Sequence, residues 1–298
     1  DLAPTVAIVS PKDTLQVRAD DSVPIHYAAS DDFGVTKLDA LVQVDERLPT
    51  VLSIPLKDPG ARKAEGDWTL SLADLLRTLP APEPGAAQGR RITYQLRVMD
   101  NHSPDAQSGF SDKRTLEITS GVTPLAQRQD ATATRDLTTA IKAAVADLTT
   151  AQKDAAKVQA ANGRALTEPE KASAQAAQDA VADARKQLTD AASQAAGGQQ
   201  SAQVQALAKA TQNIADGPAR EAEDNLAKAG LASDQPAARS GSVSAATQKM
   251  ADAKQQLQAL AGAVQAAARE QPLAHELQDL AKQQQQLADA MAARVSAA

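Results

Sequence analysis

Residues 91–99 read Arg-Ile-Thr-Tyr-Gln-Leu-Arg-Val-Met, and polar and apolar side chains alternate without a break from Arg91 to Val98. Successive side chains of a β-strand point to opposite faces, so the even-numbered residues share one face and the polar ones share the other. This pattern is typical of a strand that buries one face and exposes the other. The expected buried set is Ile92, Tyr94, Leu96 and Val98.

Seven further segments before residue 120 show weaker alternation, and Pro, Gly and Asp separate them as turns do. The eight expected strands are residues 5–9, 15–18, 22–28, 35–45, 50–56, 67–70, 91–99 and 113–119. Other residues expected to point inward are Val23, Ile25, Tyr27, Leu38, Ala40, Val42 and Val44. A short helix is expected at residues 72–79, where four leucines recur at helical spacing. Because no helical run is long enough for parallel crossovers, we predict an antiparallel β-sandwich.

After Pro124 the apolar spacing changes to alternating steps of four and three, which is the heptad pattern of packed helices. Three apolar seams follow this rule, and alanine occupies many of their positions. The first is Leu137, Ile141, Ala144, Leu148, Ala151, Ala155 and Val158; the second is Ala174, Ala177, Val181, Ala184, Leu188, Ala191 and Ala195; the third is Val243, Ala246, Met250, Ala253, Leu257, Leu260, Val264 and Ala267. We predict an elongated all-α bundle of helical hairpins or coiled coils.

Capping residues give the expected helix boundaries. Thr167 and Glu170 are spaced as a capping box at the start of the second helix. Gly217 is expected to end a third helix, and Pro218 to open a fourth that reaches about residue 229. We expect a polar loop at 230–241, a fifth helix at 242–269, and a kink or break at Pro272 before a sixth helix.

Composition divides the chain at the same point. All five aromatic residues lie before residue 111, whereas Ala and Gln dominate after about residue 125. We therefore predict two domains, a β-sandwich at residues 1–122 and a helical region at residues 123–298. Because the first strand starts within a few residues of Asp1, we also allow for a leader or anchor ahead of the numbered chain.

Charge and residue usage argue against several function classes. The formal net charge is −6, and basic residues do not outnumber acidic ones in either half. A nucleic-acid site needs clustered Lys and Arg, so we expect no nucleic-acid partner. The absence of cysteine removes disulfides, thiolate nucleophiles and zinc–thiolate sites. No apolar run approaches the roughly 18 residues needed to cross a bilayer.

Two stretches carry a resemblance to known proteins. Residues 30–35, Ser-Asp-Asp-Phe-Gly-Val, and residues 92–101, Ile-Thr-Tyr-Gln-Leu-Arg-Val-Met-Asp-Asn, resemble bacterial Ig-like and cadherin-like extracytoplasmic modules. With the Gln-rich helical tail, the chain is similar to a functionally uncharacterised family of bacterial envelope proteins. In that family a membrane-anchored N-terminus precedes the sandwich. The resemblance implies a periplasmic or extracytoplasmic, membrane-associated protein.

Cadherin-like modules bind calcium through acidic loops, which raises the question of a calcium site here. The candidate oxygen donors are Asp31, Asp32, Asp100, Asn101, Asp105 and Asp112. The competing interpretation is that these residues cap turns, as Asp and Asn commonly do, because the linked acidic motifs of cadherin sites are absent. We favour this second interpretation and expect no metal and no cofactor.

The sequence carries none of the usual catalytic motifs. His26, His102 and His275 are widely spaced, and no phosphate-binding loop or nucleophile elbow is present. Trp68 is expected in the core rather than on a sugar-binding surface. We therefore expect no enzyme, but a non-catalytic extracytoplasmic scaffold or accessory subunit that binds protein partners, for example a membrane protein complex. The alternatives are a carbohydrate- or ligand-binding surface module and an enzyme with a site assembled from distant residues.

Overall fold

The computed structural model describes residues 2–78, 90–101, 106–161, 163–197 and 200–296. After residue 270 the side chains are described only at positions 277, 280, 281, 284 and 285. The chain forms two compact units, residues 1–128 and 129–298. Antiparallel-rich β-sheets build the first unit and helices build the second, so the predicted combination of α and β structure in separate parts is confirmed.

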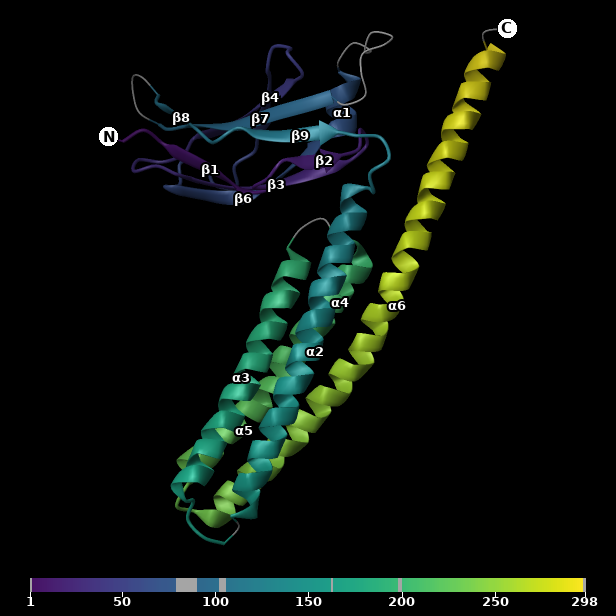
Figure 1. Cartoon of the computed structure of the whole chain (residues 1–298). Helices are drawn as coiled ribbons and strands as arrows, with labels where there is room; N and C mark the ends of the chain where they lie inside the picture. Colours follow the sequence, from purple (N-terminus) through teal and green to yellow (C-terminus); the bar gives the residue numbers. More distant parts are fainter. Residues whose placement is uncertain (1, 79–89, 102–105, 162, 198–199, 297–298) are drawn as a thin grey trace. The chain divides into compact units, whose positions relative to one another are not determined.

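Two sheets form two layers of the first unit (Figure 1). One has three strands in the order β1-β3-β6, and the other runs β2-β9-β7-β4-β5 with β8 paired to β7. The strands are β1 (Thr5–Ser10), β2 (Leu15–Val17), β3 (Ser22–Ser30), β4 (Lys37–Val44), β5 (Thr50–Ile54), β6 (Lys63–Ser71), β7 (Arg90–Met99), β8 (Ser108–Phe110) and β9 (Arg114–Ile118). A short helix, α1 (Leu72–Arg77), follows β6.

The core of this unit lies between the inward faces of the two sheets. β7 contributes its four alternate apolar residues, each with no exposed surface, and they pack in one cluster with Val23 and Ile25 of β3. All the residues predicted to point inward on β3, β4 and β7 are buried. Burial raises the pKa of Tyr94 to about 12, so its phenol stays neutral within this core. The period-two pattern therefore identified the buried face correctly.

The structure corrects the predicted sheet in two places. β2 pairs with β9 in parallel, so the sheet is not wholly antiparallel. The strand β8 was not predicted, because its three residues, Ser-Gly-Phe, are too few to show alternation. Gly109 is needed there, since a Cβ atom at this position would lie 1.7 Å from the carbonyl oxygen of Pro4.

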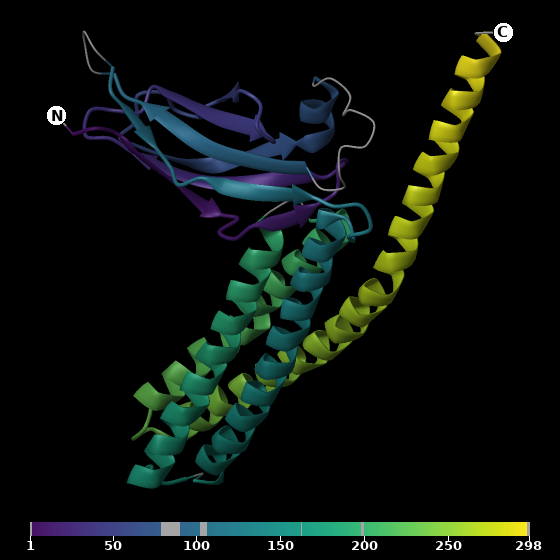
Figure 2. The same ribbon diagram turned by 45° about the horizontal axis from the view of Figure 1, so that its top comes forward.

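Among the described residues after 124, the structure has five helices and one short π-helical turn, and Figure 2 shows them in a second view. They are α2 (Leu125–Ala160), α3 (Glu168–Ala196), α4 (Ala202–Ile214), the π-helical turn η1 (Ala215–Ala219), α5 (Arg220–Leu231) and α6 (Pro236–Ser296). All residues of the first and third predicted seams are buried, as are those of the second apart from the half-buried Ala174. The seams therefore form the core of the helical unit.

Two predicted helix boundaries are wrong. The expected loop at 230–241 is only four residues long, because α6 begins at Pro236. Proline is tolerated at a helix start, since the N–H groups of the first turn have no helical partners. Pro272 does not break α6, since the good helix formers around it sustain the helix despite one lost hydrogen bond. The predicted boundary at Gly217 and Pro218 is confirmed, because Gly217 takes the non-helical angles φ −97° and ψ −106° at a kink between two helices.

The first turn of α2 belongs to the first unit. The Leu125 side chain is buried among the sheet residues, and its N–H donates to Asp21 Oδ1 at 3.1 Å. Arg128 donates from Nη2 to the carbonyl oxygen of Gln16. The carboxylate of Asp21 thus caps α2 from a distant part of the sequence, and the first compact unit ends at residue 128 rather than at 122.

Candidate functional site

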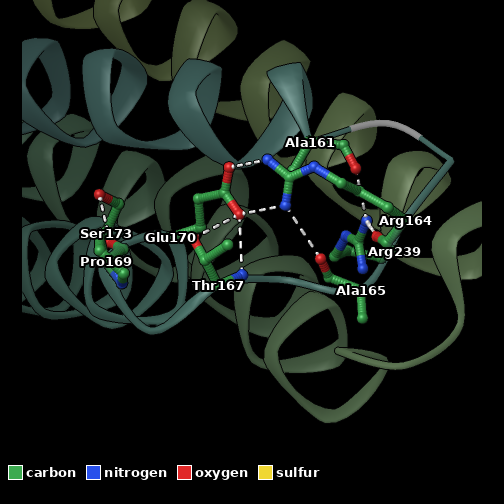
Figure 3. Close-up of polar contacts among 8 residues, drawn as sticks. All are labelled: Ala161, Arg164, Ala165, Thr167, Pro169, Glu170, Ser173 and Arg239. Carbon is green, nitrogen blue, oxygen red and sulfur yellow. Dashed lines mark hydrogen bonds and ion pairs between the residues drawn. The ribbon is translucent and has the colours of Figure 1, made fainter.

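A group of polar contacts surrounds the turn between α2 and α3 (Figure 3). Both terminal guanidinium nitrogens of Arg164 donate to the carboxylate of Glu170, at 2.8 Å from Nη1 to Oε2 and 2.5 Å from Nη2 to Oε1. The same carboxylate accepts hydrogen bonds from the backbone N–H and the hydroxyl of Thr167, each at 2.8 Å. The predicted capping box is therefore present, and an arginine that was not predicted completes it.

These contacts set the protonation of Glu170. The Arg164 guanidinium, followed by the Thr167 N–H and hydroxyl, lowers the pKa of Glu170 to about 2, because each contact favours the ionised carboxylate. The pKa of Arg164 is raised by the same hydrogen bond and ion pair. A carboxylate with so low a pKa is a poor proton acceptor at neutral pH. The group therefore fits the role of a helix cap better than that of a general base.

Arg239, near the start of α6, is the largest fully buried side chain among the described residues, with 2% of its surface exposed. Its Nη1 donates to the carbonyl oxygen of Ser233 at 2.6 Å. Its Nη2 donates to the carbonyl oxygens of Ala161 at 3.0 Å and Arg164 at 2.6 Å. Arg239 thereby joins the turn after α5 to the turn after α2, and satisfies carbonyl groups that a helix end leaves free. Figure 3 shows its side chain beside Ala161 and Arg164.

A shallow hollow of about 500 Å³ opens between α3 and α5. Leu166, Ala174 and Leu226 give it an apolar lining, and Leu231 at the end of α5 is 89% exposed. Lys171 lines it too and forms an ion pair with Glu168. This hollow is a surface on which an apolar side chain of a protein partner could rest.

The acidic loops of the sheet unit bond to their own backbone. Asp31 Oδ2 accepts from the N–H groups of Phe33 at 2.9 Å and Gly34 at 2.6 Å, and Asp100 Oδ1 accepts from the N–H of Gln107 at 2.8 Å. Asp32, Asn101 and Asp112 are exposed, and Asp105 lies outside the described residues. Within the described ranges no three His, Asp or Glu side chains are grouped so as to hold a metal ion. The turn-capping interpretation fits these contacts.

Of the three histidines, His26 is the one whose side chain the structure describes. On β3, His26 lies between two carboxylates of β6, with Nδ1 at 3.1 Å from Asp67 Oδ1 and Nε2 at 3.1 Å from Glu65 Oε1. His102 lies outside the described residues, and His275 is on α6, where its side chain is not described. Trp68 of β6 is half-buried and packs against the sheet core, as expected.

One buried charge on the sheet was not predicted. Asp39 of β4 has 1% of its side chain exposed, although it alternates with inward-facing apolar residues. Its Oδ2 accepts from Arg97 Nη2 at 2.6 Å and lies 3.2 Å from Lys37 Nζ. The sequence signal available was a lone acidic residue within the apolar run of 38–42. Arg97 faces Asp39 directly across the β4–β7 pair, and on its other side it faces Phe110, which is 53% exposed.

No protein-family model matches this chain, and the comparison with curated proteins gave no similar sequence. Within the part of the chain that the structure describes, no helix has the length and apolarity to cross a membrane.

Proposed function

We propose that this chain is a non-catalytic extracytoplasmic scaffold or accessory subunit that binds protein partners, such as a membrane protein complex. The main support for the proposal is that most of the buried polar side chains bond the protein's own backbone. In the described parts of the chain, seven buried polar side chains bond backbone groups. They are Asp21, Asp31, Asp100, Ser111, Asp130, Thr211 and Arg239.

Such side chains hold turns and helix ends in place. A catalytic site instead needs buried polar groups that point at a substrate. The long helices add extensive surface over an alanine-rich core, and Leu231 supplies an exposed apolar contact. The finer assignments are part of the same proposal: an Ig-like arrangement of the two sheets, coiled-coil packing along the three seams, and a periplasmic location at a membrane.

A second candidate function is a carbohydrate- or ligand-binding surface on the six-stranded sheet. The exposed ring of Phe110 lies beside Arg97, which pairs an aromatic face with hydrogen-bond donors. Aromatic rings and planar polar groups are the usual means of holding sugars. The prediction for this alternative is that Phe110→Ser abolishes ligand binding and leaves partner capture unchanged.

The scaffold is tested by capturing partners from the native envelope with the full chain as bait. Leu257 is fully buried in the third seam, whereas the adjacent Gln258 is exposed. Leu257→Asp puts an unpaired charge into the helical core, so we expect it to lower helicity and to abolish capture. Gln258→Asp adds the same charge on the surface and serves as the matched control.

His26→Gln is expected to capture the same partners as wild type, because a scaffold needs no titrating group at that position. If the Leu257 variant loses its helicity and keeps its partners while the His26 variant loses them, the scaffold proposal fails. A localised chemical site on the β3–β6 sheet would then have to be sought.

A further inference from the structure

The C-terminal part of α6 carries two exposed leucines that belong to a leucine stripe in the sequence. Leu277 is 67% exposed and Leu280 is 54% exposed. In the sequence they continue a spacing of four and three through Leu273, Leu287 and Met291. Both views show this part of α6 extending beyond the ends of α3 and α5 (Figures 1 and 2). Amphipathic helices gain most of their stability from packing, so such a stripe is suited to a partner helix.

The stripe is out of step with the seam that packs inside the bundle. The third seam ends at Ala267. If its spacing continued, the next positions would be residues 271, 274, 278 and 281, which are Gln, Ala, Gln and Ala. The leucines occur one residue earlier, at 273, 277 and 280. One residue corresponds to about 100° around a helix. The leucines therefore face a different direction from the buried seam, so a helix that covers the seam does not also cover the stripe.

The residues flanking the stripe favour a second copy of this chain as its partner. In a heptad with Leu273, Leu280 and Leu287 at d, the e positions are Ala274, Ala281 and Ala288. The g positions are Glu276, Gln283 and Ala290. Charges at e and g normally select an oppositely charged partner and repel a like one. With one charge among six positions, the stripe neither repels its own copy nor selects a partner of opposite charge.

One polar residue interrupts the stripe. Gln284 is exposed in the single chain and occupies an a position between Leu280 and Leu287. A buried amide is costly unless it is hydrogen-bonded. In a parallel, in-register pair each Gln284 faces the other and can exchange hydrogen bonds with it, whereas in an antiparallel pair it faces Leu280. A single polar a position is a known means of fixing register and a two-stranded state.

We infer that two copies of this chain associate through a parallel two-stranded coiled coil formed by residues 273–291 of α6. This inference goes beyond the scaffold role and does not depend on it. A self-associating helix would make the scaffold bivalent, which strengthens attachment to any partner present in more than one copy.

The test measures the molar mass of the full chain by sedimentation equilibrium over a series of concentrations. Wild type is expected to form a dimer. Leu277→Lys with Leu280→Lys should weaken association by roughly a hundredfold or more, because two charges per chain would enter the apolar stripe. The control, Leu48→Lys with Leu231→Lys, makes the same change at leucines that are 90% and 89% exposed elsewhere, and it should dimerise like wild type.

The orientation is tested by a cysteine, since the chain contains none of its own. Gln284→Cys should form a disulfide-linked dimer on mild oxidation, and Leu231→Cys should not. A monomeric wild type, or a dimer that survives the Leu277 and Leu280 changes, overturns the inference. A dimer in which Gln284→Cys fails to cross-link rules out the parallel register. None of these results bears on partner capture, which tests the scaffold role separately.

Discussion

At the level of single residues, the buried charges of Asp21 and Arg239 complete backbone structure. Asp21 accepts from the N–H groups of Arg18 at 2.8 Å and Leu125 at 3.1 Å, and so caps α2 from the sheet unit. Arg239 satisfies three carbonyl groups from two separate turns. Neither role could be predicted, because each joins residues more than 70 positions apart whose local sequence shows no capping pattern. A buried charge with such partners is costly to remove.

The first prediction concerns Arg239. Arg239→Met keeps much of the apolar stem and leaves three carbonyl groups without their donor, so we expect a loss of roughly 3 kcal/mol in the free energy of unfolding. Arg239→Lys should recover only part of it, because a single ammonium group cannot reproduce the planar fork. The control is Arg220→Met, at an exposed position of α5, expected within about 0.5 kcal/mol of wild type. The free energies of unfolding of the three variants are measured by urea unfolding, with helicity as the signal. An Arg239→Met variant as stable as the Arg220→Met control would show that these hydrogen bonds contribute little.

At the scale of elements, periodicity identified nearly every strand and helix, since each buries one face. The strand 91–99 and the three seams lie where their spacing placed them. The errors occur where spacing carries no information. β8 is too short to show a pattern, and the parallel β2–β9 pair depends on contacts between residues about 100 positions apart. Proline was overweighted at 236 and 272, because a helix can begin at the first and continue through the second.

The candidate site was less predictable than the fold. The capping box at Thr167 and Glu170 has a local signature, so the sequence revealed it. Arg164, Arg239 and the Asp39–Arg97 pair have none, because their partners are brought together only by tertiary packing. Asp31 accepts from the N–H groups two and three residues further along the chain, which fits the predicted turn interpretation, whereas Asp100 accepts from the N–H of Gln107, seven positions away.

The start of α3 gives a prediction about pH. The folded-state pKa of Glu170 is about 2, below its ordinary value of 4.5, so its ionised form stabilises the helix start above about pH 5. That contribution is lost as the pH falls towards 2. The difference in melting temperature between wild type and Glu170→Gln should therefore be largest near neutral pH and shrink between about pH 5 and pH 2.

The control for this experiment is Glu168→Gln on the same turn, where the carboxylate is 86% exposed. It should melt with a pH dependence close to that of wild type. A difference between wild type and Glu170→Gln that stays constant down to about pH 2 would show that the bonds to Arg164 and Thr167 do not stabilise the ionised carboxylate.

At the scale of the whole molecule, the two units rest on different kinds of core. The sheet unit buries large side chains such as Ile25, Tyr94 and Leu96, whereas the helical unit relies on alanine alternating with larger aliphatic residues. At about 25 cal/mol per Å² of buried apolar area, alanine contributes far less than leucine, so long helix overlap must compensate. Each unit nevertheless has a complete apolar core of its own. Because each unit buries its own apolar cluster, we predict that each folds without the other and without a bound metal.

The most direct test is the thermal unfolding of residues 1–128 expressed alone, followed by circular dichroism with and without EDTA. We predict a β-type spectrum and one cooperative transition whose midpoint EDTA does not change. A fragment ending at residue 120 should melt at a lower temperature, because it loses the buried Leu125 side chain and the hydrogen bond from the Leu125 N–H to Asp21. An unfolded 1–128 fragment, or a midpoint lowered by EDTA and restored by calcium, would contradict the account.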